Sequence, residues 1–317
     1  MSVKNAIKAT TMAAALLSPS IADAQEKPQN EVAVAIIDMG ADKMYSNDPN
    51  VSFVDLTPED TGNRRRASYQ VDGRDHGELV ADTFVKEYRL LDPDAKITIY
   101  SVNPFYKDGL TGPMKFSRST IQQALPKLQE ANVRIAITTF GVENEAAGKR
   151  ILQDFAKADM IVFAAAPNDK GDKGIWPAAS PEAISVADTT TKKSAFYKDK
   201  DWGSWVDFTS NGQFHKGTVD VVGSSYATPK VAAYGAYAAR IYPNIKTDEM
   251  RVILRKDAEN ITAHGANFPN VSGESYSKRF LASNATQEFP RVDSKGRAPA
   301  PEAQTIVALS YKEGASR

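Results

Sequence analysis

Short apolar runs rich in Val and Ile alternate along this chain with longer segments whose apolar residues recur at helical spacing. The runs 31–37 and 160–166 are almost continuously apolar, which is typical of strands covered on both faces. Further strands are predicted at 51–56, 96–102, 133–140, 183–188 and 305–311, and helices at 77–91, 119–131, 146–157, 226–241 and 247–257. This alternation predicts βαβ units and an α/β fold with a mostly parallel sheet.

The polar residues that adjoin these elements fall into two groups. Asp38, Gly141 and Asn168 each follow the end of a predicted strand, whereas His76 and Ser225 each stand at the start of a predicted helix. Ligands of parallel sheets bind at the carboxyl ends of the strands. We therefore expect all five residues to gather at one edge of the sheet.

Composition excludes several classes of function. The 317 residues suffice for one large α/β domain or two small ones, and Lys+Arg and Asp+Glu are balanced at 39 each. A balanced chain has no bulk charge to attract nucleic acid or an anionic membrane, so no nucleic-acid partner is predicted. Cysteine is absent and only three histidines occur, which rules out disulfides and thiolate sites and disfavours a His-rich metal centre.

The first 24 residues resemble an export signal. Lys4 and Lys8 give a positive start, residues 9–17 form a short apolar stretch, and Ala22-Asp23-Ala24 is a cleavage pattern. The stretch is too short to span a bilayer, and no later run is long enough, so no stable membrane insertion is predicted. We expect a secreted or periplasmic protein, the alternative for this segment being a disordered N-terminus.

Asp38, His76 and Ser225 follow one another in an order that suits nucleophilic catalysis. A serine hydroxyl is a weak nucleophile until a base takes its proton and a carboxylate orients that base. Each residue alone has a plainer interpretation, because Asp38 can cap a turn, His76 can lie in a surface loop and Ser225 can be a helix N-cap. Ser224 is the alternative nucleophile. His215 and His264 lie in polar stretches and are expected to be structural or solvated.

Four segments resemble the motifs of the subtilisin-like serine proteases, the subtilases. They are Ile36-Ile37-Asp38-Met39-Gly40, Asp75-His76-Gly77-Glu78-Leu79-Val80-Ala81, Ala164-Ala165-Ala166-Pro167-Asn168-Asp169 with Trp176-Pro177-Ala178 and Ala183-Ile184-Ser185-Val186 after it, and the serine motif Gly223 to Pro229. Their shared order makes the resemblance specific. It implies a three-layer α/β/α sandwich and a serine endopeptidase acting on protein or peptide substrates.

The resemblance also implies a role for each residue. Ser225 would attack the peptide carbonyl, His76 would take and return the proton, and Asp38 would orient the imidazole. The side-chain amide of Asn168 would donate to the oxyanion beside the backbone N–H of Ser225. The cleft that receives an extended substrate strand would be lined by Thr139, Phe140, Gly141, Ala164, Ala165 and Ala166.

Several positions depart from the family's usual residues. They are Leu79 and Asp82 in the histidine motif, Pro167 before the oxyanion asparagine, Thr139 and Phe140 in the cleft, and Lys230 after the Thr-Pro. Proline fixes φ and removes an N–H, so Pro167 alters the approach to Asn168. Only residues 25–30 separate the predicted signal from the first strand, fewer than a folding pro-domain needs.

The predicted organisation is a signal peptide at 1–24, a polar leader at 25–30, a subtilase-like catalytic domain at 31–260 and a C-terminal extension at 261–317.

No cofactor is predicted. Subtilases often carry structural calcium, but Asp169 and Asp172 are a weak ligand pair and no metal is assigned. The alternative functions are a non-catalytic peptide-binding module, an esterase or transacylase, and a nucleotide-binding protein, the last lacking any phosphate-binding Gly motif. The sequence does not indicate the oligomeric state.

Overall fold

The structure is a computed structural model of the whole chain. It describes residues 31–40, 48–58, 64–71, 74–109, 113–141, 145–168, 175–189, 205–216, 219–263, 266–271 and 273–284. The predicted signal peptide, the polar leader and a strand predicted near 305–311 lie outside the described residues. Among the described helices, none is long and apolar enough to cross a membrane.

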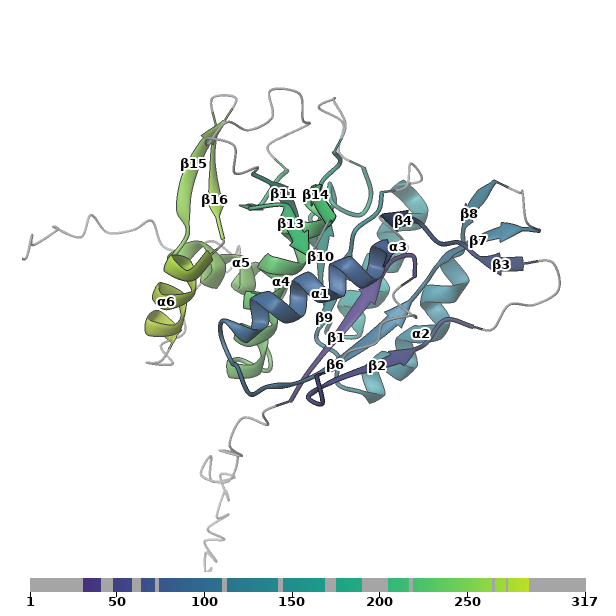
Figure 1. Cartoon of the computed structure of the whole chain (residues 1–317), viewed down its shortest axis with the longest axis horizontal. Helices are drawn as coiled ribbons and strands as arrows, with labels where there is room; N and C mark the ends of the chain where they lie inside the picture. The colour runs from purple at the N-terminus through teal and green to yellow at the C-terminus, as the bar shows by residue number, and fades with distance from the viewer. Residues whose placement is uncertain are drawn as a thin grey trace, which may run out of the picture.

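A large, mostly parallel sheet forms the centre of the molecule (Figure 1). Across the sheet the described strands run in the order β15 (Glu259–Ala263), β16 (Ala266–Asn270), β12 (Phe208–Ser210), β11 (Ala183–Asp188), β10 (Ile161–Ala165), β9 (Ile135–Thr138), β1 (Glu31–Ile37), β6 (Lys96–Val102) and β2 (Val51–Asp55). Every pair is parallel except β15 with β16. The chain turns from one side of β1 to the other between β6 and β9, which creates a switch point beside β1.

Helices cover both faces of this sheet and bury two separate apolar clusters. One cluster joins the sheet to α1 (His76–Arg89), α4 (Ser224–Ile241), α5 (Thr247–Lys256) and α6 (Gly273–Asn284). The other joins the opposite face to α2 (Arg118–Glu130) and α3 (Glu145–Lys157). The fold is therefore the three-layer α/β/α sandwich expected from the sequence.

The helix α4 packs closely on the sheet where its buried face carries small residues. Gly235 sits against β10, and a Cβ atom there would come within 2.4 Å of the Phe163 ring. Ala232, Ala236 and Ala239 continue this small surface and are buried. The close approach fixes the direction of α4 and hence the place of its first residues, which include Ser225.

Three short antiparallel sheets among the described residues are separate from the central sheet. The sheet of β3 (Arg64–Arg66), β7 (Phe105–Asp108) and β8 (Met114–Phe116) projects at the right of Figure 1. The other two are β4 (Gln70–Val71) with β5 (Arg74–Asp75), and β13 (Gln213–Lys216) with β14 (Val219–Val222). β5 leads directly into α1 and therefore positions His76.

The chain beyond residue 260 packs on the same core. The predicted boundary at 260 falls inside β15, and β16 pairs with β12 in the main sheet. In α6, Tyr276 and Phe280 are buried and pack edge-on against Tyr234 of α4, with ring centroids 4.7 and 5.3 Å away. Residues 266–271 and 273–284 therefore form part of the layered structure that carries the site.

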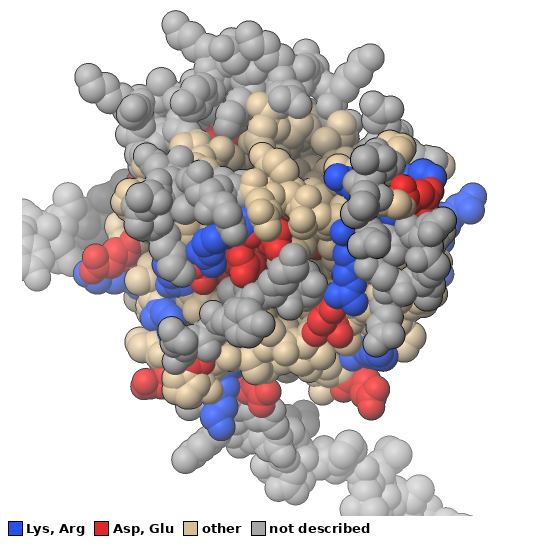
Figure 2. Space-filling model, turned by 45° about the vertical axis from the view of Figure 1, so that its right-hand side comes forward, with Lys and Arg blue, Asp and Glu red and all other residues tan. Residues whose placement is uncertain are grey.

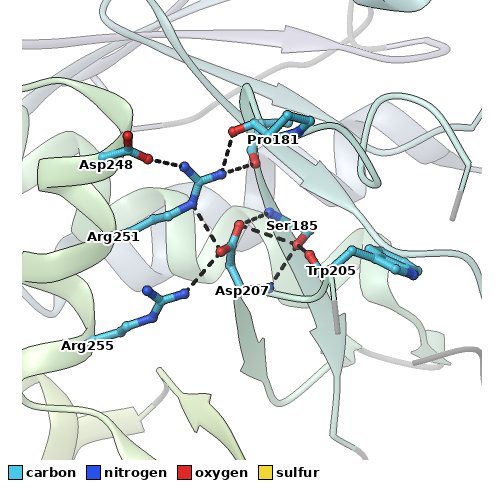
Figure 3. A network of polar contacts seen from close by, with 8 residues as sticks. Pro181, Ser185, Trp205, Asp207, Asp248, Arg251 and Arg255 are labelled. Atoms are coloured by element: carbon cyan, nitrogen blue, oxygen red, sulfur yellow. Dashed lines mark hydrogen bonds and ion pairs between the residues drawn. The ribbon is translucent and has the colours of Figure 1, made fainter. Parts of the chain in front are cut away.

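A half-buried carboxylate, that of Asp207, connects α5 to the sheet (Figure 3). Asp207 precedes β12 and accepts hydrogen bonds from the backbone amide of Ser185 at 3.1 Å, from Nε of Arg251 at 3.0 Å and from Arg255 at 3.1 Å. Arg251 also donates to the carbonyl of Ala183 at 2.6 Å. One carboxylate thus connects two neighbouring strands and one helix.

Each predicted strand and helix that falls among the described residues is found within a few residues of its expected bounds. The strands at 96–102 and 183–188 coincide with β6 and β11 residue for residue. The helix α6 and the short strands β3, β4, β5, β7, β8 and β12 to β16 were not predicted. These strands have two to five residues, too few for an alternating pattern to be recognised.

Acidic and basic side chains are mixed on the face seen in Figure 2, without a broad region of one sign among its described residues. Charged side chains of the described residues form ion pairs, for example Arg66 with Asp55 at 2.5 Å and Arg74 with Asp82 at 3.0 Å. Such a surface generates no extended field that would attract a polyanion. The absence of a nucleic-acid partner remains a prediction.

Candidate active site

Asp38 lies immediately beyond the last residue of β1. Its backbone amide donates to the carbonyl of Val102, 3.1 Å away, which continues the β1–β6 ladder by one residue. Its side chain is only 1% exposed, and Oδ1 accepts the backbone N–H of Met39 at 2.6 Å. A buried carboxylate needs such donors, because unpaired burial of a charge is strongly unfavourable.

His76 is the first residue of α1, and its backbone directs the side chain toward Asp38. The amide of Asp75 donates to Oε2 of Glu78 at 3.0 Å, as in the reciprocal half of a capping box, and this contact starts the helix at His76. The amide of Gly77 donates to the carbonyl of Met39 at 2.8 Å, which joins the helix start to the loop after β1. The imidazole Nδ1 lies 2.8 Å from Oδ2 of Asp38.

The pKa of His76 is set by two opposing effects. Burial of the imidazole acts to lower the pKa, whereas the negative charge of Asp38 and the hydrogen bond to it act to raise it. The net result is a pKa raised above the ordinary value of 6.5. With Nδ1–H donating to Asp38, the neutral ring keeps Nε2 as the acceptor that a general base requires.

Two tyrosines, which the sequence analysis did not identify, flank the imidazole. The ring centroids of Tyr69 and Tyr226 each lie 5.7 Å from that of His76, and both rings are tilted relative to the imidazole. The carbonyl of Tyr69 also accepts the backbone N–H of His76 at 2.8 Å. Tyr226 could have been noticed as the residue that follows Ser225, but no pattern marks Tyr69. Together they limit the orientations open to the imidazole.

Ser225 is the second residue of α4 and faces the same region as His76. Backbone amides in the first helical turn have no partner inside the helix, so this position can donate to an anion. The Ser225 hydroxyl donates to the carbonyl of Thr139 at 3.4 Å. Within the described part of the chain it makes no hydrogen bond to His76, although the neighbouring Tyr226 contacts the imidazole ring.

Asn168 follows β10 and is held by the residue before Ser225. Its Oδ1 accepts the backbone N–H of Ser224 at 3.0 Å and the Ser224 hydroxyl at 3.1 Å. The same hydroxyl also donates to the carbonyl of Ala166 at 2.5 Å. Because Oδ1 is engaged, Nδ2 is the amide atom left to donate, and among the described residues it has no acceptor.

The expected cleft residues fall into two kinds. Thr139, Phe140 and Gly141 leave the sheet after β9, so they lie outside its hydrogen-bonded ladder. Ala164, Ala165 and Ala166 are buried at the end of β10, whose paired residues have neighbours on both sides. The first segment can therefore pair with an added strand, and the second can contribute small buried side chains.

An aromatic cluster lies against the first of these segments. Phe140 packs on Phe105 of β7, Phe116 of β8 and Trp176, with ring centroids 4.9, 5.5 and 6.1 Å away. Phe140 is marked in the sequence as a departure in the cleft, but its three aromatic partners have no sequence signal. These rings fill space beside Thr139 and Gly141 and stiffen the segment.

The remaining candidates are not brought to the site. The Ser224 hydroxyl is bonded to Ala166 and Asn168 and is only 1% exposed, which argues against it as the nucleophile. His215 is exposed on β13. His264, Asp169 and Asp172 lie outside the described residues. Among the residues that are described, no group of three or more His, Asp or Glu could hold a metal ion.

The chain belongs to the subtilase family, because the family's sequence pattern matches residues 29–273. This membership supports a serine peptidase, a hydrolase whose substrates are proteins or peptides. Among curated proteins the comparison finds no match.

Three solved structures with a similar fold share less than 20% sequence identity with this chain. A protease domain of PatA, studied as a serine-to-alanine variant, superposes with a TM-score of 0.57 at 17% identity, covering 81% of this chain and 96% of its own. A cold-adapted subtilisin-like serine proteinase gives 0.55 at 18% identity, covering 76% and 89%. The prenylagaramide maturation protease PagA gives 0.52 at 16% identity, covering 79% and 93%. At these identities the likeness establishes the fold alone.

Proposed function

We propose that this protein is a serine endopeptidase that hydrolyses peptide bonds through an acyl-enzyme. Ser225 is the nucleophile, His76 the general base and acid, Asp38 the orienting carboxylate and Asn168 an oxyanion donor. The observation that carries the proposal is the buried contact of 2.8 Å between His76 Nδ1 and Asp38 Oδ2. This contact lies beside the start of the helix that bears Ser225.

The first half of the reaction forms the acyl-enzyme. Ser225 Oγ attacks the carbonyl carbon of the substrate while its proton passes to Nε2 of His76. The carbonyl oxygen becomes an oxyanion, which accepts hydrogen bonds from Asn168 Nδ2 and from the backbone N–H of Ser225. The C–N bond then breaks, and the imidazolium returns the proton to the leaving amine.

The second half regenerates the enzyme. A water molecule gives one proton to His76 and attacks the acyl carbon, and the Ser225 oxygen leaves with that proton. Asp38 stays ionised throughout and stabilises the imidazolium at each stage. The Ser225 hydroxyl must leave the carbonyl of Thr139 for the imidazole. Catalytic contacts are often loose before substrate binds.

The substrate is proposed to bind as an extended strand along Thr139, Phe140 and Gly141, with Ala164 to Ala166 beneath one of its side chains. Hydrogen bonds from its backbone would supply affinity without demanding a particular sequence. Selectivity would then come from the side-chain spaces that remain beside Phe140. Export to a periplasm or to the exterior is proposed with the same function and rests on the sequence of residues 1–24.

The test is active-site labelling together with a peptide-library digest. The unaltered protein should react with a fluorophosphonate and cleave peptides, whereas Ser225→Ala should do neither. Ser275→Ala, an exposed serine of α6, is the matched control and should retain both. Absence of labelling and cleavage in the unaltered protein would favour a non-catalytic peptide-binding module. Labelling with turnover of esters alone would favour an esterase.

A further inference from the structure

Thr139 and Asp38 are the first residues beyond the paired ends of β9 and β1. In the parallel pair of β1 and β9, Ile37 is in register with Thr138, so the next residues on the two strands are Asp38 and Thr139. Both lie at the carboxyl ends of their strands, at the switch point of the sheet. Both side chains are almost completely buried. The register of the two strands therefore places the threonine hydroxyl beside the carboxylate.

The Thr139 side chain contacts the acid of the proposed triad. Its hydroxyl Oγ1 donates to Oδ2 of Asp38, the same oxygen that His76 Nδ1 contacts at 2.8 Å. The other oxygen, Oδ1, accepts the backbone N–H of Met39. The carboxylate is consequently held by three donors, and rotation about its χ2 angle would break all three.

The Thr139 backbone contacts the nucleophile. Its carbonyl oxygen accepts the Ser225 hydroxyl at 3.4 Å. A single residue thus touches the acid with its side chain and the nucleophile with its main chain. Its neighbour Phe140 is fixed by the aromatic cluster, with the Phe105 ring 4.9 Å away.

We propose that Thr139 is a positioning residue for catalysis. Its hydroxyl fixes the Asp38 carboxylate and weakens the attraction between that carboxylate and the protonated form of His76. This role rests on the proposed function and goes beyond a place in the substrate cleft. A hydrogen bond to a carboxylate stabilises its charged form and lowers its basicity. The carboxylate therefore attracts the imidazolium less strongly, which keeps His76 neutral and able to accept a proton at a lower pH.

The effect on His76 can be separated from those of its other neighbours. The ionisable groups that face the imidazole are Asp38 from the end of β1, Tyr69 from the preceding loop and Tyr226 from α4. Burial raises the pKa of Tyr226, so this phenol stays neutral near pH 7. Asp38 is thus the charged partner through which a change at Thr139 would reach the ring.

The experiment compares Thr139→Val, which keeps the branched shape but removes the hydroxyl, with Thr139→Ser, which keeps the hydroxyl. Thr139→Val should lower kcat about ten- to a hundredfold with little change in KM, because a charge-assisted hydrogen bond is lost. The acid limb of its activity profile should move upward by about 0.5 to 1 pH unit. Thr139→Ser should restore both. Loss of affinity with an unmoved acid limb would show a substrate contact instead and overturn the proposal.

A second measurement does not depend on activity. In a Ser225→Ala background, NMR titration of the three histidines gives the pKa of His76, which a His76→Gln variant assigns. The pKa should rise in Thr139→Val, and also in Thr139→Ala if the valine variant folds poorly, but not in Thr139→Ser. Equal pKa values in all variants would overturn the proposal. If the unaltered protein neither labels nor cleaves, the proposed function fails, while the titration still decides whether Thr139 tunes the imidazole.

Discussion

The backbone N–H of Ser224 donates to Oδ1 of Asn168 at a distance of 3.0 Å. This contact joins the residue before the proposed nucleophile to the proposed oxyanion donor, and the Ser224 hydroxyl reinforces it at 3.1 Å. A Cβ atom at Gly223 would lie 3.3 Å from Nδ2 of the same asparagine, so the glycine leaves room for the amide. The amide is therefore oriented before any substrate arrives, which is the condition for efficient electrostatic stabilisation.

Replacement of Asn168 by Ala should lower kcat by a factor of about 10² to 10³ and change KM little, since the lost donor acts on the developing oxyanion. Steady-state kinetics on a fluorogenic peptide measure this effect. Asn244→Ala, an exposed asparagine in the turn after α4, is the matched control and should leave kcat unchanged. A rise in KM without a fall in kcat would instead assign Asn168 to ground-state binding.

The pH dependence of activity should reflect the raised pKa of His76. Activity requires the neutral imidazole, so kcat/KM should fall as pH drops, with its acid limb above 6.5. Asp38→Asn removes the charge that raises the pKa and leaves burial, which lowers it. The limb should therefore move to lower pH while kcat falls on the order of 10⁴-fold. An unmoved limb would mean that another group controls it.

The same shift should appear in stability. Because folding raises the pKa of His76, the folded state binds the proton more tightly than the unfolded state. This contribution is complete below the unfolded pKa of about 6.5 and is lost as pH rises through the folded value. Urea unfolding of Ser225→Ala at several pH values should detect it, and the added Asp38→Asn change should abolish it. Persistence in that double variant would implicate a different group.

Loss of the Asp207 carboxylate should weaken the attachment of α5 to the sheet (Figure 3). Asp207→Ala leaves Nε of Arg251 and the backbone amide of Ser185 without their acceptor, and should lower the free energy of unfolding by about 3 kcal/mol. Asp248→Ala removes an acceptor of the same arginine, but that carboxylate is 64% exposed, so its effect should be under about 1 kcal/mol. Equal losses of unfolding free energy in the two variants would contradict the conclusion that Asp207 attaches α5 to the sheet.

The aromatic contact between α6 and α4 should also contribute to stability. Phe280 is fully buried beside Tyr234, so Phe280→Ala should cost about 3 to 5 kcal/mol in urea unfolding. Lys278→Ala on the exposed side of the same helix changes only a surface pair with Glu274 and is the control. A loss below about 1 kcal/mol for Phe280→Ala would show that α6 is dispensable to the fold.

The regular elements of the central sheet could be predicted because burial on both faces leaves long apolar runs such as 31–37. The order of the strands could not, because the parallel pairing of β1 with β9 joins residues far apart in sequence. The short strands at the site end, such as β5, are fixed by tertiary contacts instead of their own sequence.

In the proposed site, too, some features could be predicted from the sequence and others could not. Motif order was enough to nominate Asp38, His76 and Ser225, whose roles remain predictions. The contact of Thr139 with Asp38 depends on strand register, and that of Tyr69 with His76 depends on a loop. Neither relationship has a signature in local sequence. The sequence pattern indicates the chemical groups of the proposed site but not the contacts that orient them.

The three groups of the proposed triad come from β1, α1 and α4, which are assembled only when the layers close on one another. A nascent chain still lacking α4 would carry the carboxylate and the imidazole but no alcohol to activate. The protein would therefore become able to cleave peptide bonds only once its fold is complete. An incompletely synthesised chain would not cleave the proteins around it.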